Sequence, residues 1–305
     1  MQKDRKKKKM KNQVPYFVMV FLPLTFFIIF KYWPMFGLSI AFQNYKLGAP
    51  FISPKSDWVG LRWFKQMVNS PFFPRLVRNT VLLSTLGLVI SFPLAIFMAI
   101  MLNEIRNRKL RKFTSNISLL PHFISTAVIV GIMFNFFSVD GGLVNQIITK
   151  MGGKSTDFMA SNAWFRTMYT GSGVWQNVGF NAVVFTAAIS GIDPNLYEAA
   201  DIDGSTRFKN IFYITIPCIL PTIIIMLILR IGSIMSVGYE KIILMYTPSI
   251  YETADTLSTY SYRAAFQDGK TSFASAIGMF DAIINLILVV AANRFSKKFS
   301  ETSLW

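Results

Sequence analysis

The sequence is poor in the residues that build disulfides and metal centres. Its 305 residues include one cysteine, Cys218, and one histidine, His122. A disulfide needs two cysteines, and a structural metal site usually needs about four ligands, commonly cysteine and histidine. We therefore predict no disulfide within the chain, no structural metal site and no resident cofactor.

Charged residues are also scarce. They make up 15% of the chain, whereas soluble domains carry about 25%. Hydrophobic residues reach 52%, and phenylalanine alone occurs 29 times. The net charge is +16, but the basic residues form short clusters beside long apolar runs. This pattern is typical of the cytoplasmic ends of membrane spans rather than of a nucleic-acid surface, so we predict an integral membrane protein.

Six segments are long and apolar enough to cross a bilayer as helices. They cover residues 14–33, 79–102, 116–138, 168–190, 214–237 and 273–293. With both termini in the cytoplasm, the two densest basic clusters fall inside the cell. We predict an all-α membrane domain over residues 14–300, preceded by a basic cytoplasmic tail at 1–13. Arg75 and Arg78, at the outer start of the second span, are expected to snorkel toward water.

The amino-terminal segment has a second interpretation, as a cleaved signal peptide. A basic tract precedes its apolar run, and residues 39–41 resemble a cleavage site. Lys31 and Pro34 separate the apolar run from that site, and the run is nearly long enough to span a bilayer. We therefore expect a retained first span.

The segment between the fourth and fifth spans is the most informative. Asp193 suits a helix N-cap and Pro194 the first helical position. Gly204 permits a sharp turn with a positive φ angle, and Ser205 can cap a second helix that runs toward the membrane. The pattern predicts a helical elbow at the inner face that serves as a protein-binding site; a plain connecting loop is the alternative.

A family resemblance falls on this elbow. Glu198-Ala199-Ala200, three residues, Gly204, nine residues and then Ile214-Thr215-Ile216-Pro217 resemble the EAA signature of permease subunits of binding-protein-dependent ABC importers. Ile216 stands where that signature usually has leucine. Short motifs elsewhere, in residues 78–80, 102–104, 120–121 and 140–145, are similar to the carbohydrate branch. The stretches 238–248 and 260–263 resemble the subgroup named for the LplB permease, and the resemblance covers most of residues 14–300.

The resemblance implies a six-helix type I importer permease (MetI-like) with a cytoplasmic coupling helix at about 194–203. Such a subunit carries a sugar, oligosaccharide or glycan fragment across the cytoplasmic membrane of a prokaryote and is not itself an enzyme. The implied partners are a second permease subunit, a cytoplasmic ATPase dimer that binds ATP and Mg²⁺, an extracellular or periplasmic solute-binding protein, and membrane lipid. The ATPase contacts are implied for Glu198, Ala199, Ala200, Asp203 and Gly204.

Alternatives remain for the transported solute and for the class of protein. The chain can be an importer permease for a non-carbohydrate solute, an ion-coupled secondary carrier, or a membrane scaffold without transport. A carrier usually has ionisable groups in several spans, whereas Glu240 and Asp281 are the only carboxylates near span depth here. A scaffold has no need of polar faces in three spans.

Polar side chains within the spans predict the solute path, because such groups tend to face a water-filled interior. Amides bind sugar hydroxyls, and aromatic rings cover the apolar faces of sugars. Helix–helix packing is the alternative role, and we favour packing or a subunit contact for Asp281. We expect His122 to be an interfacial or packed residue. The path candidates are Trp175, Gln176, Asn177, Phe180 and Asn181 in the fourth span, and Ser233, Ser236 and Glu240 on one face of the fifth.

Overall fold

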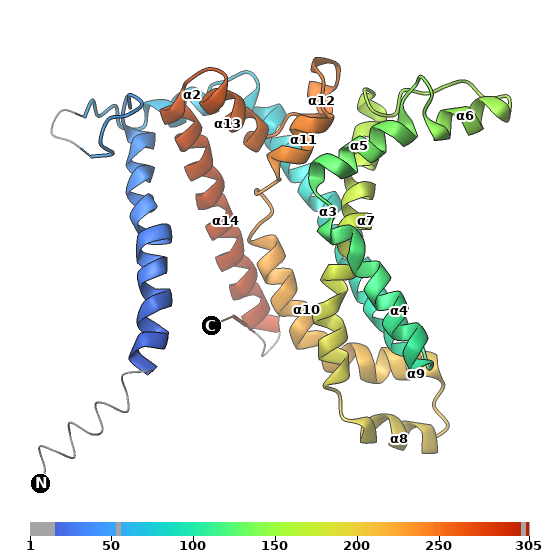
Figure 1. Ribbon diagram of the computed structural model, residues 1–305. Coiled ribbons are helices and arrows are strands. Elements are labelled where there is room, and N and C mark those ends of the chain that lie inside the picture. Colours follow the sequence, from blue (N-terminus) through green and yellow to red (C-terminus); the bar gives the residue numbers. More distant parts are fainter. Residues whose placement is uncertain (1–15, 53–55, 300–302, 305) are drawn as a thin grey trace, which may run out of the picture. The chain divides into compact units, whose positions relative to one another are not determined.

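The computed structural model describes residues 16–52, 56–299, 303 and 304. Every regular element among these residues is a helix (Figure 1), which confirms the predicted all-α fold. The extended backbone contributes one isolated bridge, between Gln43 and Trp58. The basic tail predicted at 1–13 lies outside the described residues.

The apolar helices correspond to the predicted spans. Within the described residues, four helical runs are long and apolar enough to cross a membrane: Tyr16–Phe42, Phe73–Glu104, Arg207–Ile231 and Thr271–Lys298. Helix α7 (Asn162–Ser190) has 29 residues and covers the predicted fourth span. It is less apolar than those four runs, because Gln176, Asn177 and Asn181 interrupt its apolar residues.

The predicted third span, residues 116–138, is broken by a sharp bend rather than formed by one straight helix. Helix α4 (Arg108–Leu119) passes into the short helix η3 (Leu120–Phe123), and helix α5 (Thr126–Phe137) then continues at an angle of 97°. Pro121 is the second residue of η3 and has no N–H group to extend the hydrogen bonds of α4. Ser125 then caps α5 by accepting a hydrogen bond from the Val128 N–H.

The predicted fifth span also ends early. Helix α10 (Ile216–Ile231) stops at Gly232, and turns connect it to helix α11 (Tyr239–Met245). Asn285 of helix α14 (Thr271–Phe299) holds the connection, because its side chain accepts a hydrogen bond from the Met235 N–H and donates one to Ser236. Ser233, Ser236 and Glu240 therefore do not share one helical face, and that prediction is wrong.

The contacts divide the chain into two parts. The first comprises residues up to Asn69 together with Arg263–Met279, and the second comprises Ser70–Tyr262 and Phe280–Trp305. In the first part, the indole N–H of Trp63 in helix α2 (Arg62–Val68) donates to the Gln43 carbonyl over 2.8 Å, and the Tyr45 N–H donates to Ser272 over 2.9 Å.

The second part is built on helices α3 (Phe73–Glu104) and α7, which pack side by side (Figure 1). Ala95, Ala99 and Phe185 are almost completely buried where the two helices meet.

The remaining elements of the two parts are helices η1 (Ile28–Tyr32), η2 (Trp33–Phe42), α6 (Leu143–Lys150), α8 (Pro194–Ile202), α9 (Arg207–Asn210), η4 (Ile211–Thr215), η5 (Pro248–Ile250), α12 (Tyr251–Ala254) and α13 (Leu257–Phe266).

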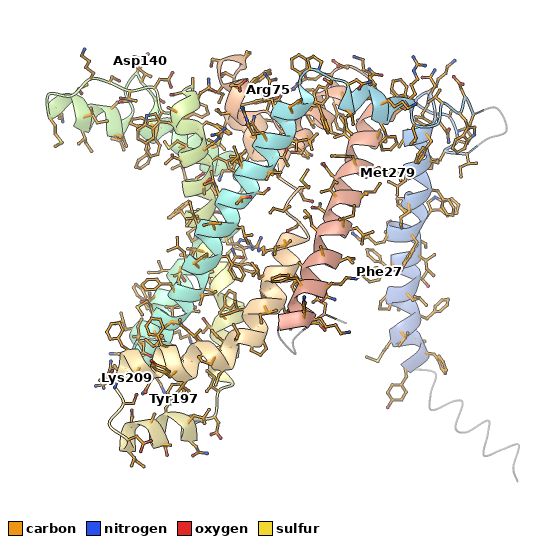
Figure 2. All side chains as sticks on the ribbon, turned by 180° about the vertical axis from the view of Figure 1, so that it is seen from behind. Phe27, Arg75, Asp140, Tyr197, Lys209 and Met279 are labelled. Carbon is orange, nitrogen blue, oxygen red and sulfur yellow. The ribbon has the colours of Figure 1, made fainter. Side chains whose placement is uncertain are left out.

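The second part has two opposite ends, which we call the α6 end and the α8 end (Figure 1). In Figure 2, Arg75 and Asp140 lie at the α6 end, whereas Tyr197 and Lys209 lie at the α8 end. The helical run Arg207–Ile231 starts at the α8 end and leads toward the middle of this part.

Candidate functional site

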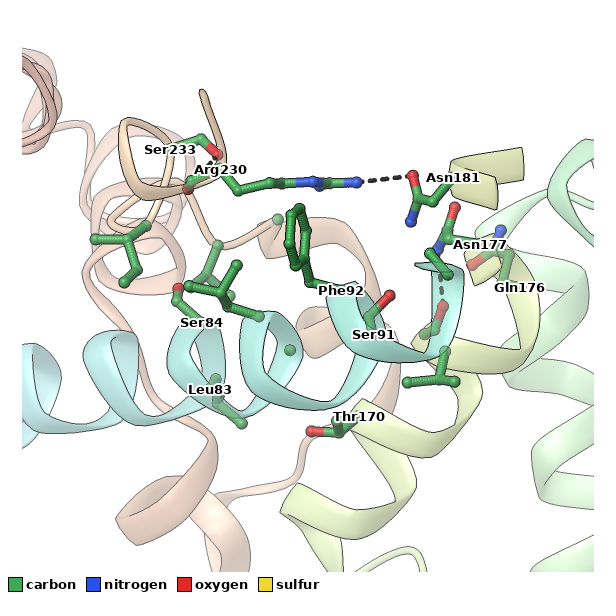
Figure 3. Close-up of a pocket in the computed structure, with 18 of the residues that line it drawn as sticks. Leu83, Ser84, Ser91, Phe92, Thr170, Gln176, Asn177, Asn181, Arg230 and Ser233 are labelled. Carbon is green, nitrogen blue, oxygen red and sulfur yellow. Dashed lines mark hydrogen bonds between the residues drawn. The ribbon is translucent and has the colours of Figure 1, made fainter. Parts of the chain in front are cut away.

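A cleft of about 540 Å³ opens in the second part, between α3, α7 and the segment that joins α10 to α11. This volume lies within the usual range of sites for small ligands. Helix α3 contributes Ser84 and Ser91, and α7 contributes the amides of Gln176, Asn177 and Asn181. The cleft therefore offers hydroxyl and amide groups from several elements to one space (Figure 3).

Most of the residues that the sequence analysis assigned to the path line this cleft. Trp175 and Glu240 are not among its lining residues; both are exposed, and Glu240 lies in the first turn of α11. The path candidates that do line the cleft are Gln176, Asn177, Phe180, Asn181, Ser233 and Ser236.

His122 reaches the cleft because the third span is broken. Its Nδ1 atom lies 3.0 Å from the Asn177 Oδ1 atom, and its ring stacks on that of Phe180 with 3.9 Å between centroids. The ring therefore packs against α7, and this contact with the polar face of α7 was missed. It depends on the turn at Pro121, which periodicity does not reveal.

Two cations in the cleft were also missed. The Arg230 guanidinium donates a hydrogen bond of 2.8 Å to Asn181 (Figure 3), and the Lys241 ammonium lies 5.4 Å from the centre of the Tyr169 ring. Burial lowers the pKa of Lys241 to about 8, so this side chain is still largely protonated at pH 7. In the sequence, these cations could have been identified only from their position, because Arg230 and Lys241 flank the segment that contains Ser233 and Ser236.

Among the described residues, none that lines the cleft carries a negative charge to balance these cations. None of its lining residues is aspartate or glutamate. Within the described chain, neither Arg230 nor Lys241 forms a salt bridge with a carboxylate. The cleft is therefore cationic.

The elbow at the α8 end has the predicted local structure. Asp193 caps α8 by accepting a hydrogen bond of 3.0 Å from the Asn195 N–H, and Pro194 is the first helical residue. Gly204 has a φ angle of 73°. Its N–H donates to the Asp201 carbonyl and the Ser205 N–H to the Ala200 carbonyl, which is the Schellman arrangement.

The second helix of the elbow starts one residue later than predicted. Thr206, rather than Ser205, caps α9, because its hydroxyl accepts a hydrogen bond from the Lys209 N–H. The expected coupling residues Glu198, Ala199, Asp203 and Gly204 are exposed, and Ala200 is half-buried.

Two side-chain contacts fix α8 to the start of the fifth span. The Tyr197 hydroxyl lies 2.9 Å from the hydroxyl of Thr215, which is 2% exposed. The Asn210 amide donates to the Asp201 carboxylate over 3.2 Å. These contacts join α8 to the run Arg207–Ile231, which carries Arg230 near its far end.

At the α6 end, Arg75 and Arg78 form ion pairs that the sequence analysis did not foresee. Arg78 forms an ion pair of 2.7 Å with Glu252, and Arg75 forms one of 3.3 Å with Asp255. These acids lie more than 170 residues further along the chain, so no local pattern announced the pairing.

Comparisons with known proteins agree with this architecture. Residues 91–301 match the model of the family "Binding-protein-dependent transport system inner membrane component". The chain is 39% identical to the polygalacturonan/rhamnogalacturonan transport system permease protein YteP of Bacillus subtilis, over 96% of this chain and 91% of that protein. It is 38% identical to the protein LplB of the same organism, over 92% and 88%.

A solved structure is similar as well. A chain in the crystal structure of a bacterial alginate ABC transporter, in complex with an alginate pentasaccharide-bound periplasmic protein, superimposes with a TM-score of 0.87 and 38% identity. The match covers 97% of this chain and 99% of that chain.

Proposed function

The chain belongs to the family of binding-protein-dependent transport system inner membrane components, and from the charge of its cleft we propose that it carries an acidic oligosaccharide across the cytoplasmic membrane. It is a membrane-embedded permease subunit of an ABC transporter for carbohydrate import and not an enzyme. Family membership sets aside the ion-coupled carrier and the scaffold.

The charge of the cleft carries the proposal. Arg230 and Lys241 face a space that is lined by no carboxylate of the described residues. A carboxylate on the solute would satisfy both cations through charge-assisted hydrogen bonds. The relatives point in the same direction, since YteP is named for polygalacturonan and rhamnogalacturonan, and alginate is an acidic polysaccharide.

The other lining residues suit the uncharged surface of a sugar. Asn177 and Gln176 offer amides to hydroxyl groups, and Phe92 and Phe180 offer rings to the apolar faces of pyranoses. The bond between Arg230 and Asn181 crosses from α10 to α7, so an incoming carboxylate that draws Arg230 away would loosen this link.

The elbow supports a route for the driving energy. Helix α8 would sit in a cytoplasmic ATPase dimer that binds ATP and Mg²⁺, and Glu198 would meet a basic group there. A movement of α8 would pass through Tyr197 and Thr215 to the run that ends near Arg230. A second permease subunit would complete the path, a solute-binding protein would deliver the saccharide, and lipid would surround the apolar helices.

Removing charge from the cleft tests the proposed solute. We expect Arg230→Gln or Lys241→Gln to lower the uptake of trigalacturonate about tenfold or more, because each variant removes a charge-assisted hydrogen bond. Uptake is measured in proteoliposomes that hold the whole transporter, with the binding protein and ATP supplied.

Three controls accompany this measurement. Arg230→Lys keeps the charge and should retain most of the uptake, and Lys154→Gln removes an exposed charge outside the cleft and should have no effect. The third is the uncharged methyl ester of trigalacturonate. Equal losses for the acid and its ester in Arg230→Gln would contradict charge recognition in the cleft.

The proposed topology places both termini and the α8 end in the cytoplasm. In a Cys218→Ser background, Ala199→Cys should react with a membrane-impermeant maleimide only after the cells are permeabilised. Lys154→Cys, beyond α6, should react in intact cells. The opposite labelling pattern would invert the topology and remove the elbow from the reach of a cytoplasmic ATPase.

A further inference from the structure

Three arginines and two acids gather at the α6 end of the second part. Arg78 lies 2.7 Å from one oxygen of the Glu252 carboxylate, and Arg75 lies 3.8 Å from the other. Arg75 also pairs with Asp255, which is 1% exposed and accepts a hydrogen bond of 2.8 Å from Thr259. Asp255 is thus fixed in the fold, whereas the Glu252 side chain is 58% exposed.

Arg166 of α7 belongs to the same cluster. One turn before it, the Asn162 amide donates to the Ser249 carbonyl over 3.0 Å and accepts from the Thr253 hydroxyl over 2.8 Å. Residues four apart share a helical face, so Arg166 lies on the side of α7 that meets the segment carrying Glu252. The Arg78 hydrogen bond holds the pKa of Glu252 below its ordinary value, and the charges of Arg75 and Arg166 act in the same direction.

We call Arg75, Arg78 and Arg166 the arginine cluster. It has more donors than acceptors: the Nε atoms of Arg75 and Arg166 are buried and have no hydrogen-bond partner among the described residues. Three guanidinium groups face two carboxylates, which leaves one positive charge in excess. Buried donors normally find an acceptor, so these two N–H groups can each donate a hydrogen bond to an anionic oxygen.

The arginine cluster lies directly beyond the cleft. Leu83 of the cleft lining follows Arg78 by five residues on α3, and Tyr169 follows Arg166 by three on α7. At the helical rise, these separations correspond to about 5–8 Å along the helix axes. A saccharide that spans a few sugar units can reach from one site to the other.

We propose that the arginine cluster is a second anion site, which receives a carboxylate of the acidic oligosaccharide at the mouth of the cleft. Glu252 is the exchangeable occupant: a solute carboxylate replaces it beside Arg78 and supplies acceptors to Arg75 and Arg166. Asp255 remains in place and keeps Arg75 oriented. This inference rests on the proposed function, because it assumes an acidic solute.

An acidic side chain of the solute-binding protein would offer the same chemistry as the saccharide. The two sources differ in whether the carboxylate can bind the transporter without the binding protein. A solute carboxylate binds the transporter in the absence of that protein, whereas a protein carboxylate contributes only to docking. The experiment therefore measures both events.

The test uses the complete membrane complex and fluorescently labelled trigalacturonate, without the binding protein. In an Arg230→Gln/Lys241→Gln background, which disables the cleft, we expect residual binding of the probe that Arg166→Gln weakens about threefold or more. Glu252→Gln should change affinity in the opposite direction, because it removes the competing carboxylate. Arg78 keeps a 3.0 Å bond to the Glu252 carbonyl and Asn79 a 2.9 Å bond to the same oxygen, so this variant retains its backbone anchors.

The outcomes separate the alternatives. If Arg230→Gln and Lys241→Gln leave the uptake of trigalacturonate unchanged, the proposed function is refuted. The second site is tested separately, by whether the double variant still binds the probe. The inference is overturned if Arg166→Gln leaves probe binding unchanged, or if it weakens binding of the methyl ester equally. It is also overturned if Arg166→Gln impairs only docking of the unloaded binding protein, because the carboxylate then comes from that protein. Lys154→Gln serves as the control for a general loss of positive charge.

Discussion

Replacing Gly204 with valine should impair both solute-stimulated ATP hydrolysis and transport. The φ angle of Gly204 is 73°, a conformation that a β-branched residue adopts only under strain. Valine would therefore break the two Schellman hydrogen bonds that end α8 and would turn the elbow away from its present direction. We expect solute-stimulated ATP hydrolysis and uptake to fall about tenfold or more, since the strain of about 1–2 kcal/mol acts directly on the proposed coupling element.

A matched variant distinguishes conformation from side-chain volume. Asparagine tolerates a positive φ angle, so Gly204→Asn should keep most of the activity although it adds a longer side chain. The variants are compared in proteoliposomes by uptake and by the hydrolysis that the loaded binding protein stimulates. Membrane yield is measured in parallel, and Glu198→Ala tests the contact without changing the turn. Normal coupling in Gly204→Val would refute a role for this elbow in energy transfer.

The second large effect is expected at Gly179, where α7 crosses the end of α4. A methyl group at this position would lie 2.0 Å from the Ser118 carbonyl oxygen and 2.5 Å from its carbon. Both atoms belong to the backbone, so no side-chain rotation can relieve the clash. Gly179→Ala should therefore cost more than the about 1–3 kcal/mol typical of an overpacked core and should move His122 away from Asn177.

The same helix provides the control. A methyl group at Gly171 would meet no atom within 4 Å, and alanine favours a helix more than glycine does. Gly171→Ala should leave thermal stability unchanged or slightly raised, while Gly179→Ala should lower the melting temperature by several degrees. The measurement is the amount of intact complex that remains in detergent after heating, analysed by size-exclusion chromatography. Similar melting curves for the two variants would show that the α4–α7 crossing can separate at little cost.

Local sequence patterns were sufficient for the helical class and for the elbow. Length and hydropathy located the apolar helices, because the need to satisfy every backbone group in lipid leaves few alternatives. Asp193, Pro194 and Gly204 located the start and end of α8, because caps and positive φ angles depend on neighbouring residues alone. The polar residues of α7 identified one wall of the cleft for the same reason, since amides rarely occur in a span without a function or a partner.

The sequence alone, then, determined the helices, the elbow and the polar face of α7, because each of these is encoded within a few turns of chain. Only the tertiary structure decided where the third span breaks, where the fifth span ends and which charges meet. Arg230 reaches Asn181 across 49 residues, and Arg78 reaches Glu252 across 174. Such pairs are selected by the packing of whole helices against one another, and the spacing of residues along one helix carries no information about the face that its partner presents.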